Sequence, residues 1–355
     1  MIDQDQIYIQ RCFALSLRGF GTASPNPLVG AVIVKNGRVI GEGHHDKYGE
    51  AHAEVTAFEN CIEDPEGATL YCNLEPCSHT QKQTPPCVDL VIAKKIARIV
   101  VANVDPNPQV AGQGLNKLNA AGIEVTSGVL EDRGAELNEV FFKWVTQKIP
   151  FIHLKVATTL DGKMATNTGD SKWISDPWAR TEVHEMRLKY DAIMIGRETL
   201  NLDDPELSIR LVSSKGKIPK KIVVGNIANM NKNAKLFKDP ENLILVGPSV
   251  NKSTYENCIE LNDYDSVEGW KKVFQELADQ KISSVLVEGG PTLLSTLLKN
   301  KLYDRLTQYC CPLLLGEGHS FFKDQHDSMK SAQRLELGSV KKIGTQVRMD
   351  FKPRA

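Results

Sequence analysis

The sequence predicts an α/β protein with two domains, over residues 1–147 and 148–355. A chain of 355 residues has room for two domains at about 150 residues each. Apolar runs of strand length alternate with segments of helical length on both sides of a short break at 148–150. This alternation is typical of mostly parallel sheets that helices cover on both faces.

The first domain opens with an expected helix that runs to about Leu17. Asp3 stands three residues before Gln6 in a capping pattern, and Gly19 provides a stop signal. The other expected elements, in order, are a strand at 28–34, a hairpin turn at 36–37 leading into 39–40, a helix at 51–61, a strand at 68–73, a helix at 88–95, a strand at 97–102, a helix at 115–122, a strand at 123–129 and one helix at 131–147.

The second domain repeats the alternation after Pro150. Its expected elements are a strand at 151–157 with a turn at 158–163, a helix at 177–190, strands at 191–195, 220–225 and 242–247, a helix at 267–280, a strand at 283–290, a helix from Pro291, and strands from Asp304 onward.

Composition narrows the function classes. The formal net charge of -1 and the pI of about 6.7 show no basic excess, which disfavours a nucleic-acid partner. No segment resembles a signal peptide or a membrane span, so we expect a cytoplasmic protein without a membrane partner. Six of the eight cysteines sit among apolar neighbours, as buried cysteines do. Cys77 and Cys87 instead lie in a polar, proline-rich loop.

His52, Cys77 and Cys87 form a candidate zinc site. Zinc prefers imidazole nitrogen and thiolate ligands, and a catalytic site keeps a fourth position open for water. Glu54 follows the histidine by two residues and can carry a proton between that water and a leaving nitrogen. The pattern of HxE followed by PC and a second cysteine is the signature of zinc deaminases.

The alternatives are a structural zinc, or no metal and a surface carboxylate. His79 is a rival ligand in the same loop. Nine residues separate the two cysteines, whereas nucleoside and editing deaminases carry PCxxC. This spacing disfavours nucleosides and nucleic acids as substrates.

Several segments resemble the bifunctional riboflavin-biosynthesis deaminase-reductase family. SPNPLVGAVIV, GEAHAEV, LEPCSHTQKQTPPC and DPNPQVAGQGL resemble its deaminase half, and KVATTLDGKMATNTGDSKWIS and VEGGPTLL its reductase half. The resemblance implies a cytidine-deaminase-like domain, a three-layer α/β/α structure, followed by a dihydrofolate-reductase-like α/β domain. It also implies deamination of a diaminopyrimidine ribosylamine phosphate and reduction of its ribosyl group to ribityl with NADPH.

The resemblance further implies the residues of the deaminase site. The ligands of one zinc ion fall on His52, Cys77 and Cys87, and the proton shuttle falls on Glu54. Asn26 and Lys82 match substrate contacts, although Asn26 between two prolines would also serve as a turn residue. The family usually has eight residues between the cysteines, so the extra residue here leaves the alignment of Lys82 open.

For the reductase site, the resemblance implies a catalytic Lys155, a substrate set and a cofactor set. The substrate set is Ser171, Arg187, Leu207, Arg210 and Glu288; the cofactor set is Ala157, Trp173, Thr199, Asp203, Gly290, Pro291, Thr292, Leu293, Leu294, Ser295 and Thr296. The division of roles between Lys155 and Glu288 stays open. Val224-Gly225-Asn226 replaces the family's usual aspartate and small residue, which weakens any preference for NADPH over NADH.

Simple chemistry supports part of this assignment. The guanidinium groups of Arg187 and Arg210 suit a phosphate dianion. Gly289 and Gly290 precede Pro291 at a helix start, where backbone N–H groups attract anions. The alternatives are a solvated helix face for Arg187, core filling for Trp173 and a structural ion pair for Lys155.

Three rival functions remain open. One domain alone could be active, the chain could bind a phosphorylated pyrimidine without converting it, or it could edit nucleic acid. Glu54 favours an enzyme, because a sensor needs no proton shuttle. We therefore expect a small phosphorylated pyrimidine as the partner, and a homo-oligomer, either a dimer or a tetramer.

Overall fold

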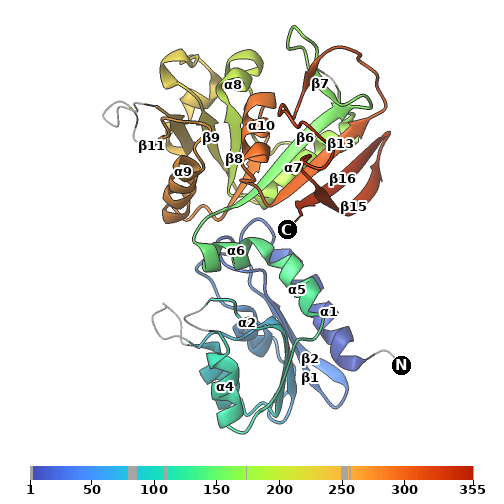
Figure 1. The fold of residues 1–355 in the computed structure, drawn as a ribbon. Coiled ribbons are helices and arrows are strands. Elements are labelled where there is room, and N and C mark those ends of the chain that lie inside the picture. Colours follow the sequence, from blue (N-terminus) through green and yellow to red (C-terminus); the bar gives the residue numbers. More distant parts are fainter. Residues whose placement is uncertain are drawn as a thin grey trace. The chain divides into compact units, whose positions relative to one another are not determined.

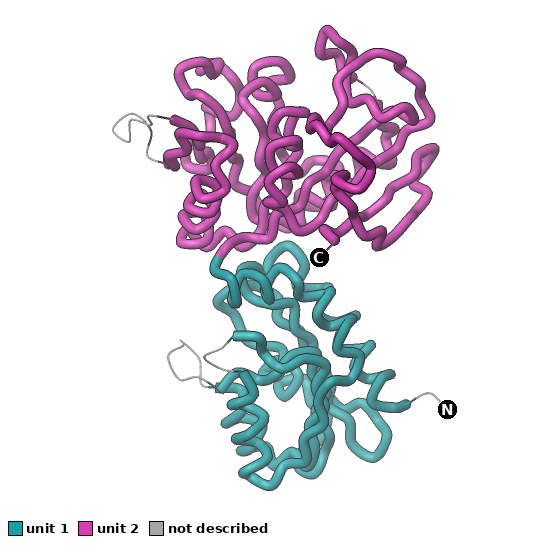
Figure 2. Tube along the Cα trace, viewed as in Figure 1, with its two compact units in different colours: residues 1–148 teal, residues 149–355 magenta. Residues whose placement is uncertain are grey.

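The computed structural model describes residues 3–78, 86–107, 111–172, 174–248, 255 and 257–354. The chain divides into two compact units, Met1–Lys148 and Ile149–Ala355 (Figure 2). Among the described helices, none combines the length and the apolar character that a membrane span requires.

The first unit is built on a five-stranded sheet of order β2-β1-β3-β4-β5 (Figure 1). Its elements are α1 (Gln4–Ser16), the 3-10 turn η1 (Leu17–Gly19), β1 (Gly30–Lys35), β2 (Arg38–His44), α2 (Ala53–Glu59), β3 (Thr69–Leu74), α3 (Cys87–Ala93), β4 (Arg98–Asn103), α4 (Gln113–Ala120), β5 (Glu124–Ser127), α5 (Glu131–Leu137) and α6 (Glu139–Gln147).

Two hydrophobic layers enclose this sheet. Successive side chains of a strand point to opposite faces: Ala31 and Ile33 join the core that includes α2, α3 and α4, whereas Val32 and Val34 join the core beneath α1. The unit is therefore a three-layer α/β/α structure.

The expected mostly parallel sheet and the hairpin at 36–37 are confirmed: β2, β3, β4 and β5 run in one direction, and within this sheet β1 alone, between β2 and β3, runs in the opposite one. One expectation for this unit is wrong. The single helix expected over 131–147 is two helices that meet at Asn138. The amide of Asn138 accepts from the N–H of Leu28 at 2.8 Å and donates to its carbonyl at 3.0 Å. These two hydrogen bonds with Leu28, which is distant in the sequence, hold Asn138 at the point where the two helices meet.

The second unit contains a nine-stranded sheet of order β11-β10-β9-β8-β12-β6-β13-β16-β15 and a separate β14-β7 pair (Figure 1). Its elements are β6 (Phe151–Thr159), β7 (Lys163–Ala165), α7 (Pro177–Lys189), β8 (Ala192–Gly196), α8 (Arg197–Asp203), β9 (Lys220–Val224), η2 (Ile227–Asn229), η3 (Lys235–Lys238), η4 (Pro240–Asn242), β10 (Leu243–Gly247), β11 (Cys258–Glu260), α9 (Val267–Asp279), β12 (Ser284–Val287), α10 (Pro291–Lys299), β13 (Arg305–Cys311), β14 (His319–Ser320), β15 (Leu335–Ile343) and β16 (Gln346–Pro353).

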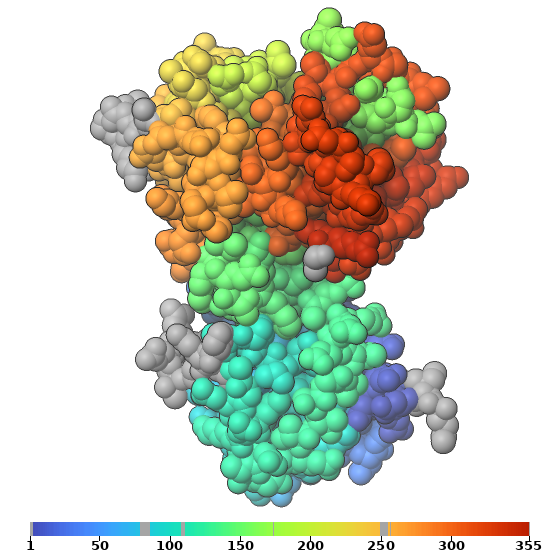
Figure 3. Space-filling model, in the orientation of Figure 1, coloured from blue at the N-terminus to red at the C-terminus, as the bar shows by residue number. Residues whose placement is uncertain are grey.

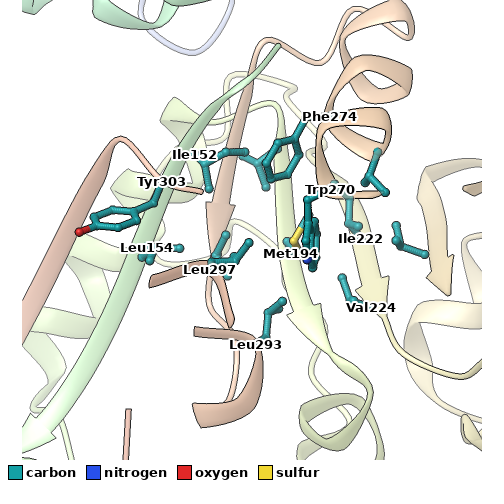
Figure 4. Packing of buried hydrophobic residues seen from close by; sticks show 14 of the residues in the cluster. Ile152, Leu154, Met194, Ile222, Val224, Trp270, Phe274, Leu293, Leu297 and Tyr303 are labelled. Atoms are coloured by element: carbon teal, nitrogen blue, oxygen red, sulfur yellow. The ribbon is translucent and has the colours of Figure 1, made fainter. Parts of the chain in front are cut away.

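The strands from β11 to β13 run parallel, and β16 and β15 extend the sheet antiparallel, as a C-terminal β hairpin. Trp270 and Phe274 of α9 pack with Leu297 of α10 against Ile152 and its neighbours on the sheet (Figure 4). The parallel order places the carboxyl ends of β8, β12 and β6 side by side, which is where ligands bind in such sheets.

Candidate functional sites

His52, Cys77 and Cys87 converge in the first unit. His52 is the N-cap residue of α2, Cys77 follows β3, and Cys87 begins α3. The Nδ1 atom of His52 lies 3.2 Å from Sγ of Cys87 and 3.5 Å from Sγ of Cys77. All three ligand atoms lie within 4.8 Å of one another. Segments up to 35 residues apart thus supply one compact donor set.

These separations fit a zinc ion. In a tetrahedral site with ordinary Zn–N and Zn–S bonds, neighbouring ligand atoms are about 3.6 Å apart. Of the two thiols, that of Cys77 favours an ionised state, whereas the hydrogen bond with Cys77 and burial raise the pKa of Cys87. The hydrogen bond with Cys87 is the largest influence that holds the pKa of Cys77 far below its usual value, and His52 acts in the same direction. One nitrogen and two sulfur ligands leave a fourth position for water.

Glu54 lies beside this donor set in the first turn of α2. Its side chain is buried, with 3% exposure. Burial raises the pKa of its carboxyl, with the neighbouring charges of His52 and Cys77 acting in opposite directions. A carboxyl group with a raised pKa next to an open ligand position is suited to take up and release a proton.

Asn26 faces a residue that the sequence did not single out, His45. The amide nitrogen of Asn26 lies 3.0 Å from Nε2 of His45, whose Nδ1 lies 3.0 Å from the carbonyl oxygen of Ala51. The buried ring of His45 stands edge-on to the ring of His52, with centroids 5.7 Å apart. His45 lies between the strand expected at 39–40 and the helix expected at 51–61, and the sequence does not reveal its pairing with Asn26, 19 positions away. Lys82 and His79 lie outside the described residues.

Glu75 is the second missed residue. It stands two positions before Cys77, is buried, and its carboxylate accepts four backbone hydrogen bonds. The donors are the N–H groups of Asp105, Gly112, Gly114 and Leu115. A Cβ at Gly114 would lie 2.6 Å from the carbonyl oxygen of Pro76, so only glycine permits this approach. Glu75 therefore fastens the segment after β4 to the segment that carries Cys77.

In the second unit, Lys155 and Glu288 lie side by side where β12 ends. Leu154 of β6 pairs with Val287, the last residue of β12, so Lys155 and Glu288 are the next residues along the two segments. Burial lowers the pKa of Lys155, and the negative charge of Glu288 opposes that shift. No hydrogen bond or ion pair of the Lys155 ammonium occurs within the described part of the chain.

Arg187 of α7 makes a two-pronged ion pair with Glu288. Its Nε and Nη2 atoms lie 2.6 Å and 3.0 Å from the two carboxylate oxygens, and its Nη1 donates to the carbonyl of Ser208 at 2.9 Å. Burial alone would raise the pKa of Glu288, but Arg187 holds it below its usual value. Glu288 is therefore an ionised carboxylate between two cations.

The segment around Arg210 is held by a residue that the sequence did not predict, His184. The backbone N–H of Arg210 donates to Nδ1 of His184 at 3.1 Å. Burial lowers the pKa of His184 to about 4, helped by the charges of Arg187 and Arg210. The imidazole is thus neutral and can accept this bond. Leu207, in the same segment, is buried with a φ of 51°.

The expected cofactor loop is the start of α10. Gly290 is the N-cap residue and Pro291 the first helical residue. A Cβ at Gly290 would lie 3.3 Å from the hydroxyl of Thr199, which brings α8 next to this helix start. Thr292 is exposed and Thr296 partly so, whereas Leu293 and Leu294 are buried in the core.

The remaining candidate residues of the reductase site differ in their contacts and in their positions in the fold. The hydroxyl of Ser295 accepts from the N–H and donates to the carbonyl of Lys323, an intramolecular role. Ala157 lies on β6, Asp203 ends α8, and Ser171 precedes α7. Trp173 lies outside the described residues.

Both units match known protein families. Residues 2–103 match the cytidine and deoxycytidylate deaminase zinc-binding region, and residues 150–349 match the RibD C-terminal domain. The chain is 38% identical to riboflavin biosynthesis protein RibD of Aquifex aeolicus, over 98% of both chains, and 37% identical to that of Escherichia coli, over 88% of this chain and 89% of that one.

Solved structures agree along the whole chain. Acinetobacter baumannii RibD has a TM-score of 0.91 and 36% identity, with 99% of both chains covered. A Thermotoga maritima protein has a TM-score of 0.88 and 34% identity, again with 99% coverage of both chains. That protein is described as a diaminohydroxyphosphoribosylaminopyrimidine deaminase/5-amino-6-(5-phosphoribosylamino)uracil reductase.

The fold, the donor set and the matches define a two-domain enzyme in which a zinc-binding, cytidine-deaminase-like domain precedes a reductase domain with a dihydrofolate-reductase-like fold. The chain belongs to the bifunctional deaminase-reductase family of riboflavin biosynthesis.

Proposed function

We propose that the first unit deaminates 2,5-diamino-6-(5-phosphoribosylamino)pyrimidin-4(3H)-one and that the second reduces the ribosyl group of the resulting 5-amino-6-(5-phosphoribosylamino)uracil with NADPH. We place the domain boundary at residues 147–148. The observation that carries the deaminase proposal is the convergence of His52, Cys77 and Cys87 beside the buried Glu54.

In the deaminase site, His52, Cys77 and Cys87 would hold one zinc ion. When bound, zinc would lower the pKa of a water molecule towards neutrality. Glu54 would accept the proton that this water loses and pass it to the amino nitrogen, which would leave as ammonia while the water oxygen stays on the ring carbon. Asn26, which His45 orients, and Lys82 would contact the substrate.

In the reductase site, the Gly290–Thr296 segment with Ala157, Trp173, Thr199 and Asp203 would bind the cofactor. NADPH, when bound, would supply the hydride that reduces C1′ of the ribosyl group, and a proton from the site would complete the reduction. Lys155 has a lowered pKa, and Glu288 is ionised beside it. These two groups would hold a substrate hydroxyl or move the proton. Ser171, Arg187, Leu207 and Arg210 would position the substrate, and Arg187 also fixes Glu288 through its ion pair.

Glu54→Gln tests the deaminase proposal. The amide cannot shuttle the proton, so deamination should fall at least about 100-fold, while zinc content and reduction of the preformed uracil substrate stay unchanged. Glu59→Gln, the same change at an exposed position of α2, is the matched control. Full deaminase activity in Glu54→Gln would contradict the proposal.

The assembly and the location remain proposals. We propose a cytoplasmic homo-oligomer, a dimer or a tetramer. Light scattering of the purified chain checks the assembly, and a monomeric mass would contradict it.

A further inference from the structure

The second unit has a basic cavity that the two reactions do not use. Its volume is about 400 Å³, within the usual range for small-molecule sites. It is formed by the end of α10, the turn before β13, the segment 324–334 and the last residues of β16. The C-terminal segments (red) lie beside the α10 region (orange) on one face of this unit in Figure 3.

Positive charge dominates the lining. Five cationic side chains surround the cavity: Lys299, Lys301, Lys330, Arg334 and Arg354. Within the described residues none of the five forms an ion pair or a side-chain hydrogen bond. Asp324, the lining carboxylate, lies 3.5 Å from His326, another lining residue. Among the described residues, no carboxylate therefore pairs with any of the five cationic groups.

Tyr303 adds a polar group without a partner. Its side chain is 4% exposed and lines the cavity, yet its buried hydroxyl has no hydrogen-bond partner among the described residues. Figure 4 shows this hydroxyl pointing away from the apolar cluster that its ring joins. Burial raises the pKa of Tyr303 to about 12, so the hydroxyl stays a neutral donor. Leaving such a group unpaired costs stability, and an accepting ligand would restore it after a small shift of the side chains that shield the hydroxyl from solvent.

The cavity is distinct from the reductase site. The proposed cofactor segment begins α10 at Gly290, whereas Lys299 ends the helix. Nine helical residues span about 13 Å. Tyr303 precedes β13, which runs parallel to β6, so the cavity lies at the amino edge of the parallel strands. Glu288 directly follows the carboxyl end of β12, so the proposed reductase residues lie towards the opposite ends of these strands.

We propose that this cavity binds a small anion with two linked phosphoryl groups, either free pyrophosphate or the diphosphate of a nucleotide. Such a group presents several acceptor oxygens and a multiple negative charge, which suits guanidinium and ammonium donors together with one neutral hydroxyl. The limited volume favours a small molecule over a polymer.

Calorimetric titration of the full chain with pyrophosphate, and separately with ADP, tests the proposal. The double variant Lys301→Gln/Arg334→Gln should weaken binding at least tenfold, and Lys272→Gln, at an exposed position of α9, should not. The titrations are made with NADPH at saturation, which fills the reductase site, so that the remaining heat reports binding in the cavity. Binding that the double variant leaves unchanged under this condition overturns the proposal. Tighter binding of ADP than of pyrophosphate would assign the site to nucleotides, and the reverse order to the free anion.

Tyr303→Phe gives a second readout. It removes only the hydroxyl, so the ligand-free protein should unfold at the same or a higher temperature. Affinity for the titrated anion should fall by about 2- to 10-fold, the value of one net hydrogen bond. Unchanged affinity in Tyr303→Phe, with a normally folded protein, would refute the role of this hydroxyl and with it the site as described.

Discussion

Glu75→Gln should strongly destabilise the deaminase unit. The carboxylate accepts two N–H groups on each oxygen, at 3.1 and 3.0 Å on Oε2 and at 2.8 and 3.3 Å on Oε1. Glutamine keeps one oxygen and turns an NH₂ group toward the other two donors. Hydrogen bonds to a charged group contribute about 1.5–3 kcal/mol each. Losing two gives about 3–6 kcal/mol, with the lower end expected after local relaxation.

Calorimetric unfolding of the full chain measures this loss, because a chain of two units need not unfold in one step. About 3 kcal/mol should lower the transition temperature of the first unit by about 6–12 °C. Glu63→Gln is the control, since Glu63 makes a surface ion pair with Arg38 and is 39% exposed; its cost should stay below about 1 kcal/mol. Equal small shifts in both variants would refute the clamp.

Three further predictions concern the active sites. Chelation of zinc should abolish deamination and leave reduction of the preformed uracil substrate intact, as separate ammonia and NADPH assays would show; parallel loss of both activities contradicts this. Lys155→Met should lower the reductase kcat at least about 100-fold without changing ammonia release, and a change in KM alone would count against a catalytic role. Burial and nearby arginines lower the pKa of His184 to about 4, so between about pH 4 and about pH 6.5 the unfolded chain binds a proton that the folded chain does not. The free energy of unfolding should therefore rise with pH across that window. In denaturant titrations His184→Asn should flatten this slope, and an unchanged slope would refute a neutral, buried His184.

Sequence patterns predict the features that depend on local chemistry. The zinc ligands follow from residue types and spacing, and most helices and strands follow from hydrophobic periodicity. The structure brings His52, Cys77 and Cys87 together as that pattern requires. Their roles, like those of the reductase residues, still await the experiments described above.

Features that depend on distant partners escape the sequence. The break at Asn138 requires Leu28, 110 residues away, and the ion pair of Arg187 requires Glu288, 101 residues away. In the sequence, Glu75 is only one residue of the loop motif around Cys77. Its role depends on backbone N–H donors that lie 30 to 40 positions downstream.

The most direct test is to incubate the chain with the diaminopyrimidine ribosylamine phosphate and NADPH and to follow ammonia release and cofactor oxidation together. The proposed reaction order predicts equal final amounts of both, with a lag in cofactor oxidation, and Glu54→Gln should suppress both until the uracil intermediate is supplied. Cofactor oxidation that precedes ammonia release, or that continues in Glu54→Gln without added intermediate, would contradict a deaminase that feeds a reductase.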